Sequence, residues 1–260
     1  MSMSTFERYQ DLICNPRVSF FGNPMSSKLL VSTDGRFQTF YAPFDHINRN
    51  AKVVICGITP GKQQAINALE EARKSLLNGD SVEVAQEKAK KFASFSGGMR
   101  PSLIAMLNHI GLDEILGITN CADLFGAHSH LVHYTSVLRN PVFRDGEDYS
   151  GKPSIVKQPA LLKQIELSLV DEIRQLGPEC LYVPLGDAVS MVFSHLESKG
   201  LINPAQVLKG LPHPSNRSIE RVHYFLGKKD RAELSNKTDP DKIDANKAAI
   251  LATVRAIRSF

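Results

Sequence analysis

Ala51-Lys52-Val53-Val54-Ile55-Cys56-Gly57, followed at once by Ile58-Thr59-Pro60-Gly61, is an apolar, β-branched run that ends in glycine and proline. Such a run is typical of a buried strand that leads into a tight turn. Three further apolar runs, at 115–120, 180–186 and 206–211, predict three more strands. Apolar residues at helical spacing predict a helix at the start of the chain and helices over 62–77, 81–94, 101–110, 159–176, 187–199 and 240–258. Because strands alternate with helices, the sequence predicts an α/β fold, a three-layer α/β/α sandwich with a central, mostly parallel four-stranded sheet.

The length and composition of the chain predict one globular domain. Its 260 residues suit a single core, and its 42% hydrophobic and 22% charged residues exclude a disordered or fibrous protein. We expect a single domain over 1–260, with a lead-in segment over 1–50 and a C-terminal helix over 240–258. No stretch is apolar over the roughly 18 residues that span a bilayer, and the first residues lack the apolar run of a secretory signal. These features predict a cytoplasmic monomer with no membrane partner.

The cysteines and the net charge limit the cofactors and partners. The four cysteines, Cys14, Cys56, Cys121 and Cys180, form no C-x-x-C pair. Structural zinc and iron–sulfur sites usually contain such a pair, so we expect reduced cysteines, no metal and no cofactor. The net charge of +4 is compatible with a polyanionic partner.

The loop at 57–61 offers backbone N–H groups beside the predicted helix that starts at Lys62. Such groups can hold an anion, a polarised carbonyl oxygen or an attacking water. A phosphate-binding loop of the form G-x-x-x-x-G-K-[ST] is excluded, because three residues separate Gly57 from Gly61 and Gln63 follows the lysine. A plain turn between a strand and a helix is the alternative.

A second loop, Leu211-Pro212-His213-Pro214-Ser215-Asn216-Arg217-Ser218, follows the last predicted strand. Its two prolines hold His213 in an extended backbone. A histidine fixed in this way can stabilise negative charge that develops in a transition state. Asn216 and Arg217 add a hydrogen-bonding tip and a contact for a phosphate.

Taken in this order, the two loops resemble the G-x-x-P-G and H-P-S motifs of the uracil-DNA glycosylase superfamily. Three further stretches agree with that resemblance, which covers roughly residues 50–226: Phe95-Ser96-Gly97-Gly98, Ile118-Thr119-Asn120 and Leu185-Gly186-Asp187-Ala188. The family cleaves the N-glycosidic bond of a base that it has flipped out of DNA.

The resemblance therefore implies a monofunctional DNA glycosylase that leaves an abasic site, in base-excision repair or in defence against modified phage DNA. It assigns catalysis to His213, which would stabilise the departing base, and to Thr59, which would orient the water. Phe95 would stack on the base and Asn120 would read its edge. The remaining assignments are a base pocket lined by Gly57, Ile58 and Gly61, and DNA contacts by Ser215, Asn216 and Arg217.

The chain departs from the family pattern at three positions of the first motif, Ile58, Thr59 and Gly61. Members of the family carry Asp or Asn where this chain has Thr59, or Glu where it has Ile58, and these residues activate the water. Thr59 is no general base at neutral pH, and the sequence does not choose among the substitutes Asp45, Asp123 and Gln63.

Gly61 is the other departure, because the most uracil-restricted members of the family carry Tyr there. That Tyr blocks substituents at the 5-position of the base. We therefore expect open space beside Gly61 and tolerance of 5-substituted pyrimidines.

Alternative interpretations remain for the histidines and for the whole chain. His128, His130 and His133 could bind a metal, contact DNA or lie on the surface. The protein could be a catalytically weakened member that binds or traps modified DNA. It could also act on RNA or nucleosides, or be a non-enzymatic α/β binding module.

Overall fold

The computed structural model describes residues 5–21 and 24–258. The predicted lead-in segment over 1–50 thus includes residues 1–4 and 22–23, which lie outside the described part. The chain forms two compact units, each assembled from separate segments. Unit 1 comprises Met1–Ile47, Ile58–Ser94 and Tyr134–Gln175, and unit 2 comprises Asn48–Gly57, Phe95–His133 and Leu176–Phe260. The chain therefore passes from one unit to the other directly after Gly57 and again after Ser94.

Unit 1 contains a four-stranded sheet of order β1-β2-β5-β6, whose successive strands pair antiparallel. The strands are β1 (Leu30–Asp34), β2 (Phe37–Phe40), β5 (Val142–Arg144) and β6 (Glu147–Asp148). β2 buries Phe37 and Phe40, whereas every residue of β1 is exposed, as suits an edge strand. Phe40 and Phe143 of this sheet, Phe6 of the N-terminal helix and Tyr41, which directly follows β2, belong to the core of unit 1.

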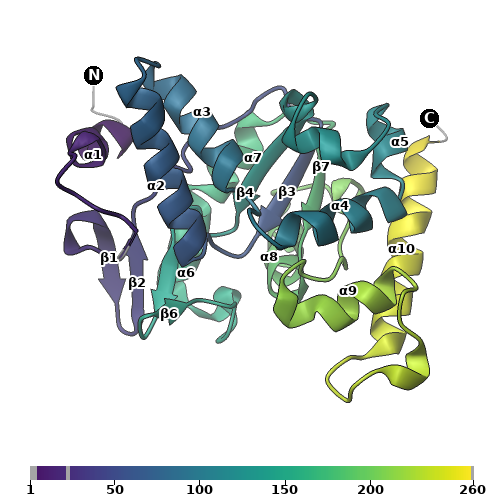
Figure 1. Ribbon diagram of the computed structural model, residues 1–260. Helices are drawn as coiled ribbons and strands as arrows, with labels where there is room; N and C mark the ends of the chain where they lie inside the picture. The colour runs from purple at the N-terminus through teal and green to yellow at the C-terminus, as the bar shows by residue number, and fades with distance from the viewer. Residues whose placement is uncertain (1–4, 22–23, 259–260) are drawn as a thin grey trace. The chain divides into compact units, whose positions relative to one another are not determined.

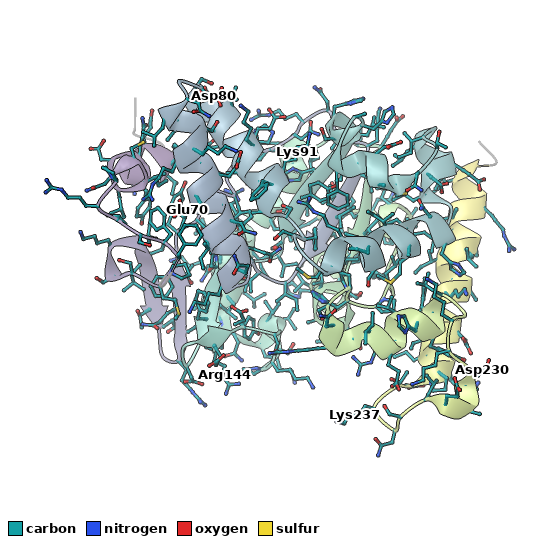
Figure 2. All side chains as sticks on the ribbon, viewed as in Figure 1. Glu70, Asp80, Lys91, Arg144, Asp230 and Lys237 are labelled. Carbon is teal, nitrogen blue, oxygen red and sulfur yellow. The ribbon has the colours of Figure 1, made fainter. Side chains whose placement is uncertain are left out.

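The helices of unit 1 are α1 (Thr5–Cys14), α2 (Lys62–Leu77), α3 (Val82–Ala93), α6 (Pro159–Leu167) and α7 (Leu169–Gln175). α2 and α3 run side by side (Figure 1). Their facing residues are largely buried alanines at helical spacing, which lets the two backbones approach closely. Asp80 lies in the loop that joins them (Figure 2). Its carboxylate accepts a hydrogen bond from Nζ of Lys88 at 2.6 Å.

The predicted helix over 159–176 is divided in two at Ser168. The Ser168 hydroxyl donates to the carbonyl oxygen of Gln164 at 2.7 Å. Such bonding back to the preceding turn competes with the regular helix pattern. The other predicted helices over 62–77, 81–94, 101–110, 187–199 and 240–258 agree with the structure to within about two residues.

The second sheet has three strands in the order β4-β3-β7, with bounds Val132–Ser136, Val53–Gly57 and Leu181–Pro184. β3 and β7 are parallel, with Val53 opposite Leu181. The predicted fourth strand at 206–211 forms only two isolated parallel bridges, Tyr182 to Val207 and Leu185 to Leu211. The fold is therefore α/β, as predicted. The prediction of a central, mostly parallel four-stranded sheet is wrong. The strands are divided between a small parallel sheet and an antiparallel one.

The strand predicted at 115–120 is also wrong, because this region holds the short helix α5 (Leu112–Leu116). Gly111 and Gly117, at φ 72° and 65°, bracket the helix in the left-handed conformation. A glycine in this conformation is a common helix end. The strand that lies beside β3 is instead β4, further along the chain.

The other helices of unit 2 are α4 (Met99–His109), α8 (Asp187–Ser198), α9 (Ile219–Phe225) and α10 (Pro240–Arg258). α9 lies against α10 (Figure 1), where Tyr224 donates to Asp244 at 2.8 Å. Short 3-10 helices include η2 (Cys121–Phe125) and η6 (Asn216–Ser218). Across the described residues, no helix combines the length and the apolarity needed to cross a membrane.

Candidate functional site

His213 is held by the loop that follows β7 in unit 2. The N–H of Gly186 donates to the carbonyl oxygen of Leu211 at 2.9 Å, which joins the end of β7 to the segment before the histidine. Gly186 has φ 83°, and a Cβ there would lie 3.1 Å from Cβ of His213. Only glycine fits this position without strain. The backbone at the end of β7 thus packs directly against His213.

The His213 imidazole is neutral at physiological pH. Burial lowers the pKa of His213 to about 4, because the charged form loses its hydration. The N–H of Ser215 donates to Nδ1 of His213 at 3.3 Å. A neutral imidazole that accepts at Nδ1 carries its proton on Nε2. His213 therefore offers one N–H donor and no charge.

A second segment of unit 2 contacts the histidine loop. A Cβ on Gly98 would lie 3.7 Å from Oδ1 of Asn216, so the Phe95–Gly98 segment and the 216–218 turn are in contact. Phe95 is buried and has φ 49°, a conformation that a phenylalanine rarely adopts. Backbone strain of this kind costs about 1–3 kcal/mol and gathers at functional sites. Asn216 and Arg217 are exposed, as a contact with DNA requires.

Asn120 does not occupy the position predicted for it. It precedes the 3-10 helix η2 and belongs to no strand. Its Oδ1 accepts hydrogen bonds from the N–H of Ala122 at 2.8 Å and from Nδ2 of Asn108 at 3.1 Å. The side chain therefore caps a short helix, which is a common use of asparagine. Its amide oxygen is already satisfied without a base.

The three neighbouring histidines do not converge on one point. The rings of His128 and His130 lie 6.0 Å apart, while His133 is buried in β4 and accepts from the N–H of Asn48 at 3.4 Å. Within residues 5–21 and 24–258, no group of three histidine, cysteine or acidic side chains is placed to hold a metal ion.

In unit 1, the side chain of Thr59 fastens the first motif to the loop after β4. Its hydroxyl donates to the carbonyl oxygen of Asn140 at 2.9 Å and accepts from the N–H of Val142 at 2.9 Å. The N–H of Leu138 also donates to the carbonyl oxygen of Ile58 at 3.0 Å. The hydroxyl proton of Thr59 is therefore occupied, which gives this residue a structural role. Its orientation of the attacking water stays a prediction.

Replacing Thr59 by valine tests this structural role. The valine would leave the N–H of Val142 and the carbonyl oxygen of Asn140 without their partner, which should lower the free energy of unfolding by about 1–3 kcal/mol. Thr59→Ser keeps the hydroxyl and should lie close to the wild type. Urea denaturation of both variants measures the difference. Equal stability of the valine and serine variants would contradict the structural role.

Asn140 is a candidate that sequence reasoning missed. It follows β4, and its Oδ1 is buried without a hydrogen-bond partner among the described residues. An unsatisfied buried acceptor costs about 1–3 kcal/mol, which a donor on a ligand could recover. The resemblance assigns the reading of the base edge to an asparagine at a strand end. Asn140 lies in the loop four residues after the last residue of β4, whereas Asn120 follows no strand. The run Val132-His133-Tyr134-Thr135, in which valine, tyrosine and threonine favour strands, was the available signal for this strand.

The space beside Gly61 is occupied, contrary to expectation. A Cβ on Gly61 would lie 3.0 Å from Oδ2 of Asp148. The other oxygen, Oδ1, accepts from the N–H of Lys62 at 2.8 Å at the start of α2. An acidic side chain at a helix N-terminus is favoured by the helix dipole. The space beside Gly61 therefore holds the Asp148 carboxylate and is not open.

The three substitutes for the water activator lie in different surroundings. Asp45, in unit 1, is partly buried and accepts from the Tyr41 hydroxyl at 2.7 Å. Asp123, in unit 2, lies 3.7 Å from His128. Gln63 is exposed on α2 and donates to Asn67 at 2.9 Å. Only Asp45 combines a carboxylate with burial in the unit that holds the 58–61 loop.

Comparison with known proteins finds a relative in Bacillus subtilis. Over 196 residues the chain is 38% identical to the "Uncharacterized protein YoxB" of Bacillus subtilis (strain 168), an alignment that covers 75% of this chain and 77% of the relative. No protein-family model matches the chain, and no solved structure matches it.

Proposed function

The chain belongs to the same family as YoxB of Bacillus subtilis, and we propose that it is a monofunctional DNA glycosylase. It hydrolyses the N-glycosidic bond of a flipped uracil-like or 5-substituted pyrimidine and leaves an abasic site in DNA. The observation that carries this proposal is the neutral His213 side chain, fixed by the loop after β7 with its proton on Nε2. The biological setting is base-excision repair or defence against modified DNA.

His213 supplies the main catalytic interaction in this proposal. When the N-glycosidic bond breaks, the electron pair stays with the base, whose carbonyl oxygen gains negative charge. A positioned N–H donor stabilises such charge strongly, since a partly buried group is screened little by water. A neutral donor also avoids the cost of holding a buried cation before the base arrives.

Asn140 takes over the role that the sequence analysis gave to Asn120. A uracil-like edge presents an N–H donor beside a carbonyl acceptor, and a side-chain amide can pair with both. The unpartnered Oδ1 of Asn140 supports this assignment because it is a buried acceptor in need of a donor. Phe95 keeps its role of stacking on the base, which its burial and strained backbone support.

The Asp148 carboxylate limits which 5-substituents the base of the proposed substrate can carry. The resemblance places position 61 against the 5-position of the base, and Asp148 fills the space beside Gly61. A carboxylate accepts hydrogen bonds and repels anions. The favoured 5-substituents are therefore small hydrogen-bond donors such as hydroxymethyl, and carboxyl groups are rejected.

A base-release assay tests the proposal. Single- and double-stranded oligonucleotides that carry uracil, 5-hydroxymethyluracil, 5-carboxyluracil or hypoxanthine are incubated with the protein, and alkali then cleaves abasic sites. We expect scission at uracil and 5-hydroxymethyluracil and none at 5-carboxyluracil. Scission at no base in either form would overturn the proposal.

One observation favours a second candidate, a protein that binds modified DNA without cleaving it. The hydroxyl of Thr59 is occupied, so the first motif holds no obvious activator of water. Tight binding of a modified oligonucleotide without scission would support this candidate. Release from free nucleosides or RNA would instead redirect the substrate class.

A further inference from the structure

Four charged side chains gather inside unit 1 and are not used by the roles given above. They come from the segment after β2, from α3, from the loop after β4 and from α7: Asp45, Lys90, Arg139 and Glu172. Lys90 and Glu172 are 3% and 1% exposed. Burying charges is costly unless each is paired, so the partners of each group indicate which of them remains available.

Three of these groups make hydrogen bonds to residues other than Asp45. Glu172 accepts from the Thr135 hydroxyl and from Nε of Arg139, each at 2.6 Å. Lys90 donates to the carbonyl oxygen of His46 at 2.7 Å. These contacts fix a lysine and an arginine beside Asp45 without bonding to it.

Among the described residues, only one oxygen of the Asp45 carboxylate takes part in a hydrogen bond. Its Oδ2 accepts from the Tyr41 hydroxyl at 2.7 Å, and among the described residues no other donor reaches the carboxylate. The side chain is partly buried, so part of it stays open to solvent. The Asp45 carboxylate therefore has a fixed orientation and an oxygen that can bind a water molecule.

The surroundings of Asp45 connect it to the first motif within unit 1. Arg139, which acts on Asp45 electrostatically, lies between Leu138 and Asn140. The backbone of those two neighbours is hydrogen-bonded to Ile58 and Thr59. The three-residue stretch that carries Arg139 thus also fastens the loop that lacks an activator of its own.

The electrostatic surroundings of Asp45 suit a general base, a group that accepts a proton. Burial raises the pKa of Asp45 above its ordinary value, while the Tyr41 hydrogen bond and the charges of Arg139 and Lys90 lower it and Glu172 raises it. Burial outweighs the lowering effects. A carboxylate with a raised pKa is a stronger base, and its efficiency improves as its pKa approaches the working pH.

We propose that Asp45 is the catalytic base that accepts the proton of the attacking water, with Tyr41 as its positioning residue. This inference rests on the proposed glycosylase function. The C1′–N bond breaks and its electron pair leaves with the base; a lone pair of the water oxygen then forms the C1′–O bond. The water gives one proton to Asp45, which releases it to solvent, and the departed base anion takes a proton from solvent. The sum is addition of one water across the bond.

Three variants of the full chain test the role of Asp45. Asp45→Asn should lower the single-turnover rate of base release by about 10²-fold without weakening binding of the substrate oligonucleotide. Tyr41→Phe removes a hydrogen bond that favours the charged carboxylate, so the pKa of Asp45 should rise. The acidic limb of the rate–pH profile should then move to higher pH in Tyr41→Phe, since the base must be deprotonated to act.

Tyr9→Phe is the matched control for Tyr41→Phe. The Tyr9 ring stacks on that of Tyr41, with centroids 4.2 Å apart and an interplanar angle of 8°. Tyr9→Phe therefore removes a hydroxyl from the same aromatic stack and should leave the acidic limb in place. A shift of the limb in both variants would indicate a structural effect and contradict the positioning role.

The outcomes separate the inference from the function on which it rests. A wild-type protein that releases base while Asp45→Asn releases it equally fast would overturn the role of Asp45 alone. An unmoved acidic limb in a well-folded Tyr41→Phe variant would do the same. A wild-type protein that releases no base would overturn the glycosylase function, and the inference would fall with it.

Discussion

His213→Ala is expected to lower the single-turnover rate of base release by roughly 10²–10³-fold, the loss typical of one donor that faces developing negative charge. The donor is the Nε2–H of a neutral imidazole whose Nδ1 accepts from Ser215. The affinity for the substrate oligonucleotide should change much less than the rate, because the interaction strengthens only as the bond breaks. Quenched-flow sampling with alkaline scission measures the rate, and fluorescence anisotropy measures the binding.

His223→Ala is the matched control, since His223 is an exposed histidine on the following helix α9. It should retain the wild-type rate. Comparable losses in both variants, or a wild-type rate in His213→Ala, would contradict the assignment.

The stability of the protein should depend on His213 as the pH falls. Because its pKa is lowered to about 4 in the folded protein and is about 6.5 in an unfolded chain, the unfolded chain binds the proton first. The folded protein thus loses stability as the pH falls from 6.5 toward 4, by up to about 3 kcal/mol from this group. Thermal melts should therefore show a smaller loss over this range in His213→Ala than in the wild type.

Asn140→Ala is expected to reduce base release by a similar factor, roughly 10²–10³-fold, because it removes a side-chain amide that pairs with the base carbonyl as charge develops there. The backbone carbonyl of Asn140 that accepts from Thr59 is retained in this variant. The buried Oδ1 lacks a partner without substrate, so its removal should not destabilise the fold.

Asn120→Ala provides the paired comparison, because the two asparagines were alternatives for one role. The Asn120 amide caps η2, and its loss should cost about 0.5–2 kcal/mol of stability while the rate of release remains near the wild type. The reverse result, an inactive Asn120→Ala and an active Asn140→Ala, would restore the assignment made from sequence.

The local features of this chain were predictable because local chemistry determines them. β3 and α2 follow from a β-branched run, two glycines and a helical period, and the structure places them at Val53–Gly57 and Lys62–Leu77. The rigid setting of His213 follows from its flanking prolines. By contrast, Ile115 and Leu116 end a short helix closed by Gly117, and a short apolar run does not distinguish such a helix from a strand.

The wrong prediction of a strand over 115–120 also bears on which asparagine is proposed to read the base. A strand over 115–120 places Asn120 at its end, whereas the strand of the structure that precedes an asparagine loop is β4, with Asn140 after it. The occupied wall beside Gly61 could not be predicted in any case, because Asp148 lies 87 residues further along the chain. Such a contact depends on how β6 pairs with β5, and no local sequence pattern encodes it.

The most direct test of the central claim is detection of the released base itself. Wild-type protein is incubated with an oligonucleotide that carries one uracil or 5-hydroxymethyluracil, and the small-molecule fraction is analysed by mass spectrometry. The glycosylase proposal predicts the free base in amounts equal to the abasic sites formed, and far less of it with His213→Ala. Intact oligonucleotide with no free base, under conditions where the protein binds it, would contradict the claim.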